Sequence, residues 1–479
     1  MTVASQALEA LEAIVGPQWM RQDQATREAF ASDGLATEHA LPGAVVLPGS
    51  RDEVIQVLRV LAQRGIPFVA RGAGTGLSGG AVAGPDAVIL GLTRLQRILA
   101  LEPDNRRAVV EPGVVNTRLS QAAAPYGLHY APDPSSQTVC TIGGNVAENA
   151  GGPHCLKYGV TTQHILALEI ALPSGEVIEL GSAAGDPWGP DLVGLFVGSE
   201  GTFGVATRIT VRLTPLPTAV RTLLADFGSL RAAGEAVSAI IAAGIVPAAL
   251  EIMDQNCIRV VEASMYRAGL PTDAAAVLIV EVDGRDDGAV AELAAAAERH
   301  VRDAGARSIR TAQAARDRER LWQGRKKTFG ALGRLSPNLV VQDAVVPRTA
   351  LPDVLAAIGG IATRHGVTVG NVFHAGDGNL HPNITYDARN PDERDRVRRA
   401  AAEIMQLCIA AGGTITGEHG VGSDKLPYMP ALFDATALEA MGTVRRAFDP
   451  EGRANPGKVL PPEAVATPRD HPPIDAVAG

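Results

Sequence analysis

Two histidines flank a short turn in the segment "FHAGDGNLHPN" at residues 373–383, and their spacing limits the chemistry they can perform. His374 and His381 are seven positions apart, which is not the four-residue spacing that brings two side chains together on one helix face. The Asp-Gly pair between them instead predicts a two-residue hairpin turn of type I′. Such a hairpin places His374 directly opposite His381, with Cβ atoms about 5 Å apart, and returns Asn383 to the same face.

Facing imidazoles can form a polar pair, lie together at the surface by chance, or bind a metal ion. A second segment, "GGTITGEHGVG" at 412–422, supplies Glu418 and His419 between glycines. Two imidazoles and one carboxylate are a common zinc ligand set that leaves a coordination position open. We expect this segment to be the end of a strand, in which neighbouring side chains point to opposite faces. Both residues can serve one site only if the glycines permit a bulge or turn.

A glycine-rich loop, "RGAGTGLSGGA" at 71–81, follows an expected strand at 66–70. Its glycines fit the dinucleotide-binding fingerprint GxGxxG, which also requires a helix to open there and an acidic residue about 20 positions later. The loop instead runs into "GGAVAGPD", and residues 94–99 contain no acid, so we reject the fingerprint. No GxxxxGK[ST] phosphate loop occurs either. The loop is a plain flexible turn or a run of backbone N–H groups that can wrap a pyrophosphate.

Two further segments favour the pyrophosphate interpretation, at 132–159 and 198–213. In this order, the three segments resemble the FAD domain of the vanillyl-alcohol-oxidase type of flavoprotein. More narrowly, the chain resembles the FAD-linked 2-hydroxy-acid dehydrogenases, which include the D-subunit of glycolate oxidase and the D-lactate and D-2-hydroxyglutarate dehydrogenases. The resemblance covers about residues 40–460.

The resemblance implies FAD bound along all three segments and beside the C-terminal stretch "ANPGKVLP" at 454–461. The implied cofactor-binding residues are Gly72, Ala73, Gly74, Thr75, Gly76, Leu77, Ser78, Pro134, Thr141, Gly143, Gly144, Asn145, Asn149, Gly151, Glu200, Gly204 and Asn455. Some relatives attach the flavin through a histidine in the pattern R-x-G-G-H. Thr75 stands at that position and cannot form the bond, so non-covalent FAD is expected.

The resemblance also implies roles for the polar residues of the two opening segments. A divalent ion, usually zinc, would be bound by His374, His381 and Glu418. His419 would act as the base, and Arg325 and Asn383 would hold the substrate. In its own sequence context, "LWQGRKKTFGALGR", the arginine could equally belong to a solvated basic helix face.

The substrate class is suggested by a missing cation. Hydroxyglutarate and some lactate relatives carry a lysine just before the pattern xDxxxP, where this chain has Val341 and Gln342. A substrate with a second, distal carboxylate would therefore lack the cation that binds this group. We expect a small D-2-hydroxy acid, glycolate or D-lactate, to be oxidised to the 2-oxo acid with metal assistance and without NAD. The competing functions are a hydroxyglutarate-type dehydrogenase, a non-catalytic flavin-binding subunit, and a zinc hydrolase using Glu418 or His419 on water.

The elements that must position these residues indicate an α+β fold. A helical lead-in at 1–40 precedes a helix that Ser50 can cap and Gly65 can end. The resemblance implies a two-lobed FAD-binding domain of the vanillyl-alcohol-oxidase type and an α+β cap domain with an antiparallel sheet. A proline-containing break near 215–217 marks the boundary. The expected units are an FAD domain at 1–217, a substrate and cap domain with the metal site at 218–425, a return to the FAD domain at 426–460, and a loose tail at 461–479.

The bulk composition limits the partners. The formal charge of −9 over 479 residues argues against nucleic acid as the main partner. The four cysteines are scattered without a CxxC, so no iron–sulfur cluster is expected in the chain. An external acceptor is implied: an iron–sulfur subunit, an electron-transfer flavoprotein or a quinone, in a hetero-oligomer or homodimer. No signal peptide or membrane span is expected, which predicts a cytoplasmic protein, membrane-associated at most through a partner.

Overall fold

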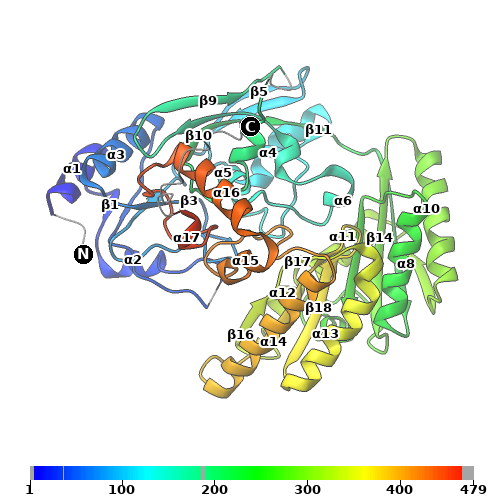
Figure 1. Ribbon diagram of the computed structural model, residues 1–479. Helices are drawn as coiled ribbons and strands as arrows, with labels where there is room; N and C mark the ends of the chain where they lie inside the picture. Colours follow the sequence, from blue (N-terminus) through cyan, green and yellow to red (C-terminus); the bar gives the residue numbers. More distant parts are fainter. Residues whose placement is uncertain (1–4, 36, 185–188, 466–479) are drawn as a thin grey trace, which may run out of the picture.

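The computed structural model describes residues 5–35, 37–184 and 189–465, and shows a two-lobed N-terminal domain beside a larger-sheet cap domain (Figure 1). The first lobe has a four-stranded sheet in the order β1-β2-β4-β3, with β2, β4 and β3 parallel. Its strands are β1 (Met20–Arg21), β2 (Ala44–Val46), β3 (Phe68–Arg71) and β4 (Val88–Gly91). Its helices are α1 (Ser5–Val15), α2 (Gln24–Ala29) and α3 (Arg51–Arg64).

Helix α3 follows the predicted capping. The Ser50 hydroxyl accepts a hydrogen bond from the Glu53 N–H at 3.2 Å, and Gly65 ends the helix at φ 63°. Its apolar face packs with α1 on the sheet. The glycine loop leaves the carboxyl end of β3, and no helix follows it directly, which agrees with the rejection of the dinucleotide fingerprint.

The second lobe is a five-stranded antiparallel sheet in the order β5-β6-β10-β8-β9. Its strands are β5 (Ile98–Glu102), β6 (Arg107–Val110), β8 (Ile165–Ala171), β9 (Val177–Gly181) and β10 (Val205–Arg212). Its helices are α4 (Asn116–Ala123), α5 (Ile142–Glu148), α6 (Cys155–Tyr158), α7 (Leu192–Phe196), and the 3-10 helices η1 (Ala124–Tyr126) and η2 (Thr161–His164). A small ribbon of β7 (Leu128–His129) and β11 (Thr214–Pro215) closes the domain, and β12 of the cap begins at Ala219.

The cap domain is built on a sheet in the order β15-β12-β14-β13-β18-β19-β17, with β16 and β20 pairing beside β18. Its strands are β12 (Ala219–Phe227), β13 (Ala249–Asp254), β14 (Ala276–Gly284), β15 (Ser308–Thr311), β16 (Asn338–Val341), β17 (Ala344–Val345), β18 (Thr368–His374), β19 (Asn379–Leu380) and β20 (Pro382–Tyr386). All of these pairs are antiparallel, so the predicted antiparallel cap is confirmed.

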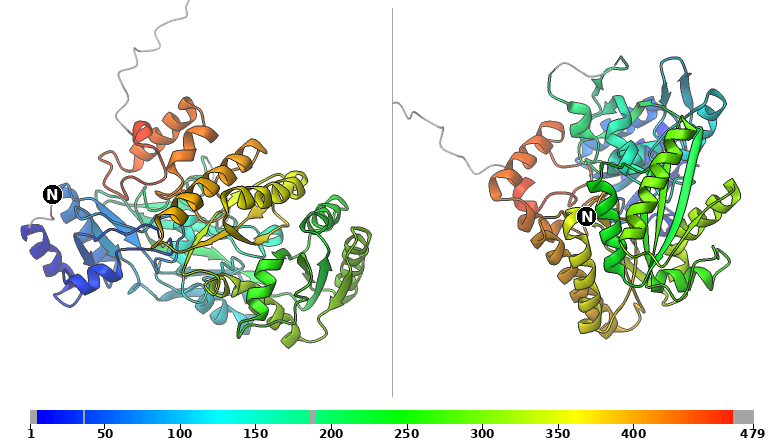
Figure 2. Two further views of the ribbon diagram at one scale, coloured as in Figure 1. Left: turned by 90° about the horizontal axis from the view of Figure 1, so that it is seen from below. Right: turned by 90° about the vertical axis from the view of Figure 1, so that its right-hand side faces the viewer.

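Helices cover both faces of the cap sheet. One face carries a row of four long helices, visible in Figures 1 and 2: α8 (Leu230–Ala242), α10 (Asp287–Asp303), α13 (Leu351–His365) and α14 (Pro391–Ala410). The other face carries α9 (Gln255–Glu262), α11 (Ala315–Lys326) and α12 (Thr328–Leu332), with the 3-10 helix η3 (Arg348–Ala350) leading into α13. Successive residues of β14 alternate between the two cores, because Leu278 and Val280 pack in one and Val277 and Ile279 in the other. This explains the uninterrupted apolar run of that strand.

The C-terminal segment returns to the first lobe. It contains η4 (Leu426–Tyr428), α15 (Met429–Leu432), α16 (Ala435–Phe448) and α17 (Pro462–Val465), drawn orange to red in Figure 1. The Phe68 N–H of β3 donates to Arg453 O at 3.0 Å, and the Asn455 N–H donates to Phe68 O at 2.8 Å. The sequence predicts a loose tail from residue 461, but α17 packs against α16 with Ala464 buried. Residues 466–479 of that expectation lie outside the described residues. Among the described helices, none has the length and apolar character needed to cross a bilayer.

Candidate active site

The histidine hairpin has a different register from the predicted one. His374 pairs with Asn379 and Asn371 pairs with Pro382, so the second strand is shifted by two residues. The turn spans four residues, 375–378, because its backbone bonds to neighbouring segments: the Ala375 N–H donates to a carbonyl of β13 at 2.8 Å. A two-residue shift preserves which side chains share a face. The His374 and His381 rings therefore still meet, with centroids 5.1 Å apart and planes at 87°.

The segment that carries Glu418 and His419 is a loop, so the expected strand end is wrong. The loop wraps around the fully buried carboxylate of Asp343, which follows β16. One oxygen of Asp343 accepts hydrogen bonds from the N–H groups of Gly417 at 2.9 Å, Glu418 at 3.2 Å and His419 at 2.9 Å. This curved backbone allows the two neighbouring side chains to face one site, which a regular strand would prevent.

Glu418 lies between the two histidines of the hairpin. Its Oε1 atom is 3.2 Å from His374 Nε2 and 3.2 Å from His381 Nε2. Possible ligand atoms of the three residues all lie within 4.8 Å of one another. Both ring nitrogens of His381 are buried and neither makes a hydrogen bond of good geometry among the described residues, although Nε2 faces the Glu418 oxygen at 3.2 Å, so a lone pair is available. The donor set and the orphaned imidazole both fit a zinc-type ion.

A second possible ligand group shares His381 with Asp343 and His419. One oxygen of Asp343 accepts bonds from the loop backbone and lies 3.3 Å from the Lys425 ammonium, whereas the other oxygen lies 3.6 Å from His381 Nδ1 and has no hydrogen-bond partner among the described residues. His419 stacks on His381 with ring centroids 5.0 Å apart. Burial lowers the pKa of His419 to about 4 despite the nearby Asp343 carboxylate. The imidazole is therefore neutral at pH 7 and can accept a proton.

Glu251 of β13 joins the hairpin to the arginine, although none of the sequence motifs described above includes it. It is fully buried, and its two oxygens lie 2.7 Å from His374 Nδ1 and 2.6 Å from Arg325 Nε. Contact at Nδ1 leaves Nε2 of His374 free to face Glu418, which is the usual arrangement around a metal-bound histidine. Burial lowers the pKa of His374, but the Glu251 and Glu418 carboxylates outweigh it and raise that pKa well above its ordinary value.

Arg325 is a buried residue of α11 and not part of a solvated basic face. Its Nη2 atom has no hydrogen-bond partner within the described chain, although the residue lines a cavity. Lys326 lies 3.2 Å from Asp133, whereas Lys327 is exposed at the cavity mouth. Asn383 donates from its amide to the backbone, lines the same cavity, and has an Oδ1 atom without a hydrogen-bond partner in the part of the chain that the structure describes.

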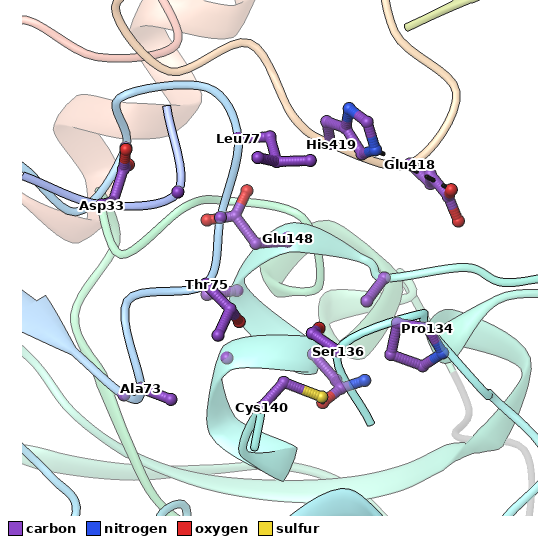
Figure 3. Close-up of a pocket in the computed structure, with 18 of the residues that line it drawn as sticks. Asp33, Ala73, Thr75, Leu77, Pro134, Ser136, Cys140, Glu148, Glu418 and His419 are labelled. Atoms are coloured by element: carbon purple, nitrogen blue, oxygen red, sulfur yellow. Dashed lines mark hydrogen bonds and ion pairs between the residues drawn. The ribbon is translucent and has the colours of Figure 1, made fainter. Parts of the chain in front are cut away.

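The glycine segments line this cavity, which has a volume of about 750 Å³ (Figure 3). The predicted cofactor residues on its wall are Gly72, Ala73, Gly74, Thr75, Gly76, Leu77, Pro134, Thr141, Gly143, Gly144, Asn145, Gly151, Glu200 and Gly204. The same wall includes His374, His381, Glu418 and His419, so the glycine loops and the histidine cluster share one space. Gly151 marks the junction, because a Cβ atom there would lie 2.6 Å from a Glu418 oxygen.

Three predicted cofactor residues lie behind the wall and shape it. The Ser78 carbonyl accepts bonds from the N–H groups of residues 423 and 424. Asn149 ends α5 at φ 53° and accepts a bond from the Thr162 N–H. The Asn455 amide donates to the carbonyls of Gly80 at 2.8 Å and Glu200 at 2.7 Å. Asn455 thus fastens the C-terminal segment to two of the glycine segments.

Comparison with known proteins agrees with this arrangement. Residues 42–181 match the family described as "FAD binding domain", and residues 216–459 match "FAD linked oxidases, C-terminal domain". The chain is 47% identical over 432 residues to glycolate oxidase subunit GlcD of Escherichia coli strain K12, covering 90% of this chain and 86% of that protein. It is 40% identical to GlcD of Bacillus subtilis strain 168, covering 95% and 97%. It is 31% identical to D-lactate dehydrogenase of Anaerostipes hadrus, covering 90% and 92%.

The fold is shared with more distant flavoproteins. A solved structure of p-cresol methylhydroxylase superposes with a TM-score of 0.81 at 16% identity, over 95% of this chain and 96% of that one. The 4-ethylphenol oxidase of Gulosibacter chungangensis gives 0.78 at 20% identity, over 96% and 99%. At these identities the likeness shows the vanillyl-alcohol-oxidase fold alone. The sequence relatives show more: the chain belongs to the FAD-linked oxidases, as a 2-hydroxy-acid oxidoreductase of the glycolate oxidase and D-lactate dehydrogenase type.

Proposed function

We propose that the protein oxidises a small D-2-hydroxy acid, glycolate or D-lactate, to the 2-oxo acid on a divalent metal, most simply zinc. The observation that carries this proposal is the shared cavity in which His374, His381 and Glu418 meet the glycine segments. Bound FAD, held without a covalent link, supplies the hydride acceptor. A bound ion at the two histidines and Glu418 would lower the pKa of the substrate hydroxyl.

The substrate would be oriented by Arg325 and Asn383. The unpartnered Nη2 atom of the arginine offers a donor to the substrate carboxylate, and Glu251 fixes the guanidinium through Nε. The Asn383 Oδ1 atom is left free by the two carbonyl bonds that hold its amide. Both groups therefore hold their positions before substrate arrives.

His419 would take the hydroxyl proton. It is neutral, lines the cavity, and lies 3.9 Å from the same Glu418 oxygen that the other two histidines approach. The loop around Asp343 holds its backbone N–H at 2.9 Å, which fixes the base relative to the proposed ligands.

The remaining wall of the cavity favours a short substrate. Val341, which pairs with Asn383, and Val372, two residues before His374, line it on the cap side, and the lysine expected of hydroxyglutarate-type relatives is absent at 341–342. An apolar wall suits hydrogen or methyl as the substituent on C2 better than a chain that carries a second carboxylate. A D-2-hydroxyglutarate dehydrogenase is the second candidate, and the exposed Lys327 at the mouth is the observation in its favour.

Two competing functions account for fewer of the observations. A non-catalytic flavin-binding subunit would have no need of the histidine cluster, and a zinc hydrolase would have no need of the glycine segments. We also propose that electrons leave to an external acceptor, an iron–sulfur subunit, an electron-transfer flavoprotein or a quinone, in the cytoplasm. Each of the four cysteines is free, so none forms a disulfide that could store electrons.

A dye-linked oxidation assay with D- and L-2-hydroxy acids, paired with metal analysis, tests the proposal. Wild-type protein should oxidise glycolate or D-lactate and contain one divalent ion and one FAD per chain. His381→Ala should lose the ion and turnover while retaining FAD. The matched control is His365→Ala, which removes a histidine of α13 that contacts Glu403 and is not part of the cavity wall. Full turnover and unchanged metal content in His381→Ala would overturn the metal assignment.

A further inference from the structure

A carboxyl group outside the histidine cluster projects into the cavity. Glu148 is the last residue of α5 and lines the wall between the first glycine loop and the His419 loop (Figure 3). Its Oε2 atom is buried and has no hydrogen-bond partner within the described chain. A Cβ atom on Gly420 would lie 2.5 Å from this oxygen, which places the carboxyl beside the residue that follows His419.

A second carboxyl, that of Glu200, lies close to the same position beside Gly420. The Cβ position on Gly420 lies 2.7 Å from Glu200 Oε1. Glu200 accepts hydrogen bonds from the N–H groups of Val421 at 2.6 Å and Gly422 at 2.8 Å, which satisfy a carboxylate. Among the described residues, none donates in this way to the buried oxygen of Glu148. Two adjacent carboxyls cannot both ionise easily, so the one without donors keeps a proton.

The charges around Glu148 agree with a neutral acid. The nearby cation, Lys425, is directed to Asp343 at 3.3 Å and to the Gly420 carbonyl at 3.1 Å. The carbonyl end of α5 also disfavours an anion. Burial, then the Glu200 and Asp33 carboxylates, raise the pKa of Glu148 well above its ordinary value, and burial raises the pKa of Glu200 to about 7.

We infer that Glu148 is a neutral carboxylic acid that donates a hydrogen bond to the flavin ring of bound FAD. This inference rests on the proposed function for one point: a hydride acceptor must reach a substrate beside His419, so the redox end of FAD lies at this end of the cavity. The pyrimidine part of a flavin carries the carbonyl oxygens and ring nitrogens that accept such a bond. Glu148 is therefore assigned as a positioning and tuning residue for the cofactor.

The hydrogen bond from Glu148 should shift the reduction potential of the flavin in a direction that can be measured. Two-electron reduction places negative charge on the flavin, and a neutral donor stabilises that charge more than it stabilises the oxidised ring. Loss of the donor should lower the equilibrium constant for reduction at least tenfold, which is about 30 mV for a two-electron couple. An ionised Glu148 would do the opposite, because removing its negative charge would favour reduction.

The experiment compares the FAD midpoint potential of full-length holoprotein in three variants. Glu148→Gln retains a neutral donor and should keep the wild-type potential. Glu148→Leu retains volume without a donor and should lower the potential by about 30 mV or more. Glu148→Ala replaces the leucine variant if that protein does not bind FAD. Glu292→Gln, the same substitution at an exposed residue of α10, is the control and should leave the potential unchanged.

Two results would overturn the inference. A raised potential in both Glu148→Gln and Glu148→Leu would show that Glu148 is ionised. An unchanged potential in Glu148→Leu, or in Glu148→Ala where it replaces that variant, would show that Glu148 does not contact the flavin. Failure of the wild-type protein to bind FAD, or to oxidise any 2-hydroxy acid, would instead count against the proposed function.

Discussion

Glu251 is the carboxylate on which both halves of the proposed substrate site depend. It bridges His374 and Arg325 at 2.7 Å and 2.6 Å, and the side chains of His374 and Arg325 are each only 6% exposed. Glu251→Gln keeps the size and one oxygen but removes the negative charge. The guanidinium is then buried without its counter-ion, and the imidazole loses the partner that directs Nε2 toward Glu418.

The expected size of the effect follows from these contacts. Removing one partner of a buried ion pair costs about 3–5 kcal/mol of folding free energy. Loss of the group that orients a metal-bound histidine weakens metal binding about 10–100-fold. The Michaelis constant should rise in parallel, because Arg325 is no longer fixed for the substrate carboxylate.

Three measurements on one preparation test this. Chelator competition gives the zinc dissociation constant, chemical denaturation gives the free energy of unfolding, and dye-linked assays separate kcat from KM. The matched control is Asp254→Asn, at the end of the same strand. Asp254 is buried and accepts hydrogen bonds from Cys257 and Asn371, so its change should cost about 1–2 kcal/mol of stability and leave metal affinity unaltered.

The outcome that refutes the reasoning is specific. If Glu251→Gln binds zinc within twofold of wild type and keeps its KM, the bridge does not position either partner. If it loses stability but no more metal affinity than Asp254→Asn does, the carboxylate is structural alone.

Three further predictions concern the loops around the cavity. Gly420→Ala should lower FAD affinity and reduce the free energy of unfolding by about 1–3 kcal/mol or more, because Gly420 has φ 84° and the new Cβ atom would lie 2.5 Å from a carboxyl oxygen. The control is Gly452→Ala, where φ is 66° and the space around the new Cβ atom is open. This control measures the backbone cost alone and should keep FAD affinity. Asp343→Asn should loosen the loop at 416–419, so that kcat falls by a larger factor than the FAD content of the protein does. An equal loss of kcat and of FAD content would contradict this prediction. His154 lies between two carboxylates, which raise its pKa to about 10. It should therefore stabilise the fold fully below pH 6.5 and progressively less up to pH 10. The difference in unfolding free energy between wild type and His154→Gln, measured across that range, should shrink with rising pH.

Local signals in the sequence were sufficient for the elements that position the site. The capping serine and terminal glycine of α3 predicted both ends of that helix, because capping depends on residues within one turn. The apolar run of β14 is typical of a strand buried on both faces, since such burial removes the alternation of apolar and polar residues. The proline-containing break near 215–217, which stays a prediction of the domain boundary, lies between β11, which ends at Pro215, and β12, which begins at Ala219.

The hairpin shows where local signals fail. The Asp-Gly pair favours a two-residue turn, but only Gly378 of the pair has positive φ, and the turn spans residues 375–378. Backbone bonds from Ala375 to β13 and from Val346 to Gly378 compete with the tight turn. The face was nevertheless predicted correctly, because side-chain alternation has a period of two and the register error was also two.

Two residues of the site were missed because their partners lie far away in the chain. Glu251 stands within "AALEIM" and Asp343 within "VVQDAVV", each a single acid in an apolar stretch. Such an acid in a buried strand must be paired, so the pattern does indicate a hidden partner. The identity of that partner is set by strand order and loop return, which no single segment encodes.

The contact between β3 and the C-terminal segment has a consequence for biosynthesis. The strand that launches the first glycine loop is completed by residues 453–455, and Asn455 also fastens the third glycine segment. N-terminal domains generally begin to fold while the ribosome is still translating, at about 5–20 residues per second. Here the flavin domain must wait for nearly the whole cap to be synthesised, a delay of roughly 10–50 s at that rate. Cofactor loading is therefore a late event, and the nascent first domain must pass that interval with its flavin cavity incomplete.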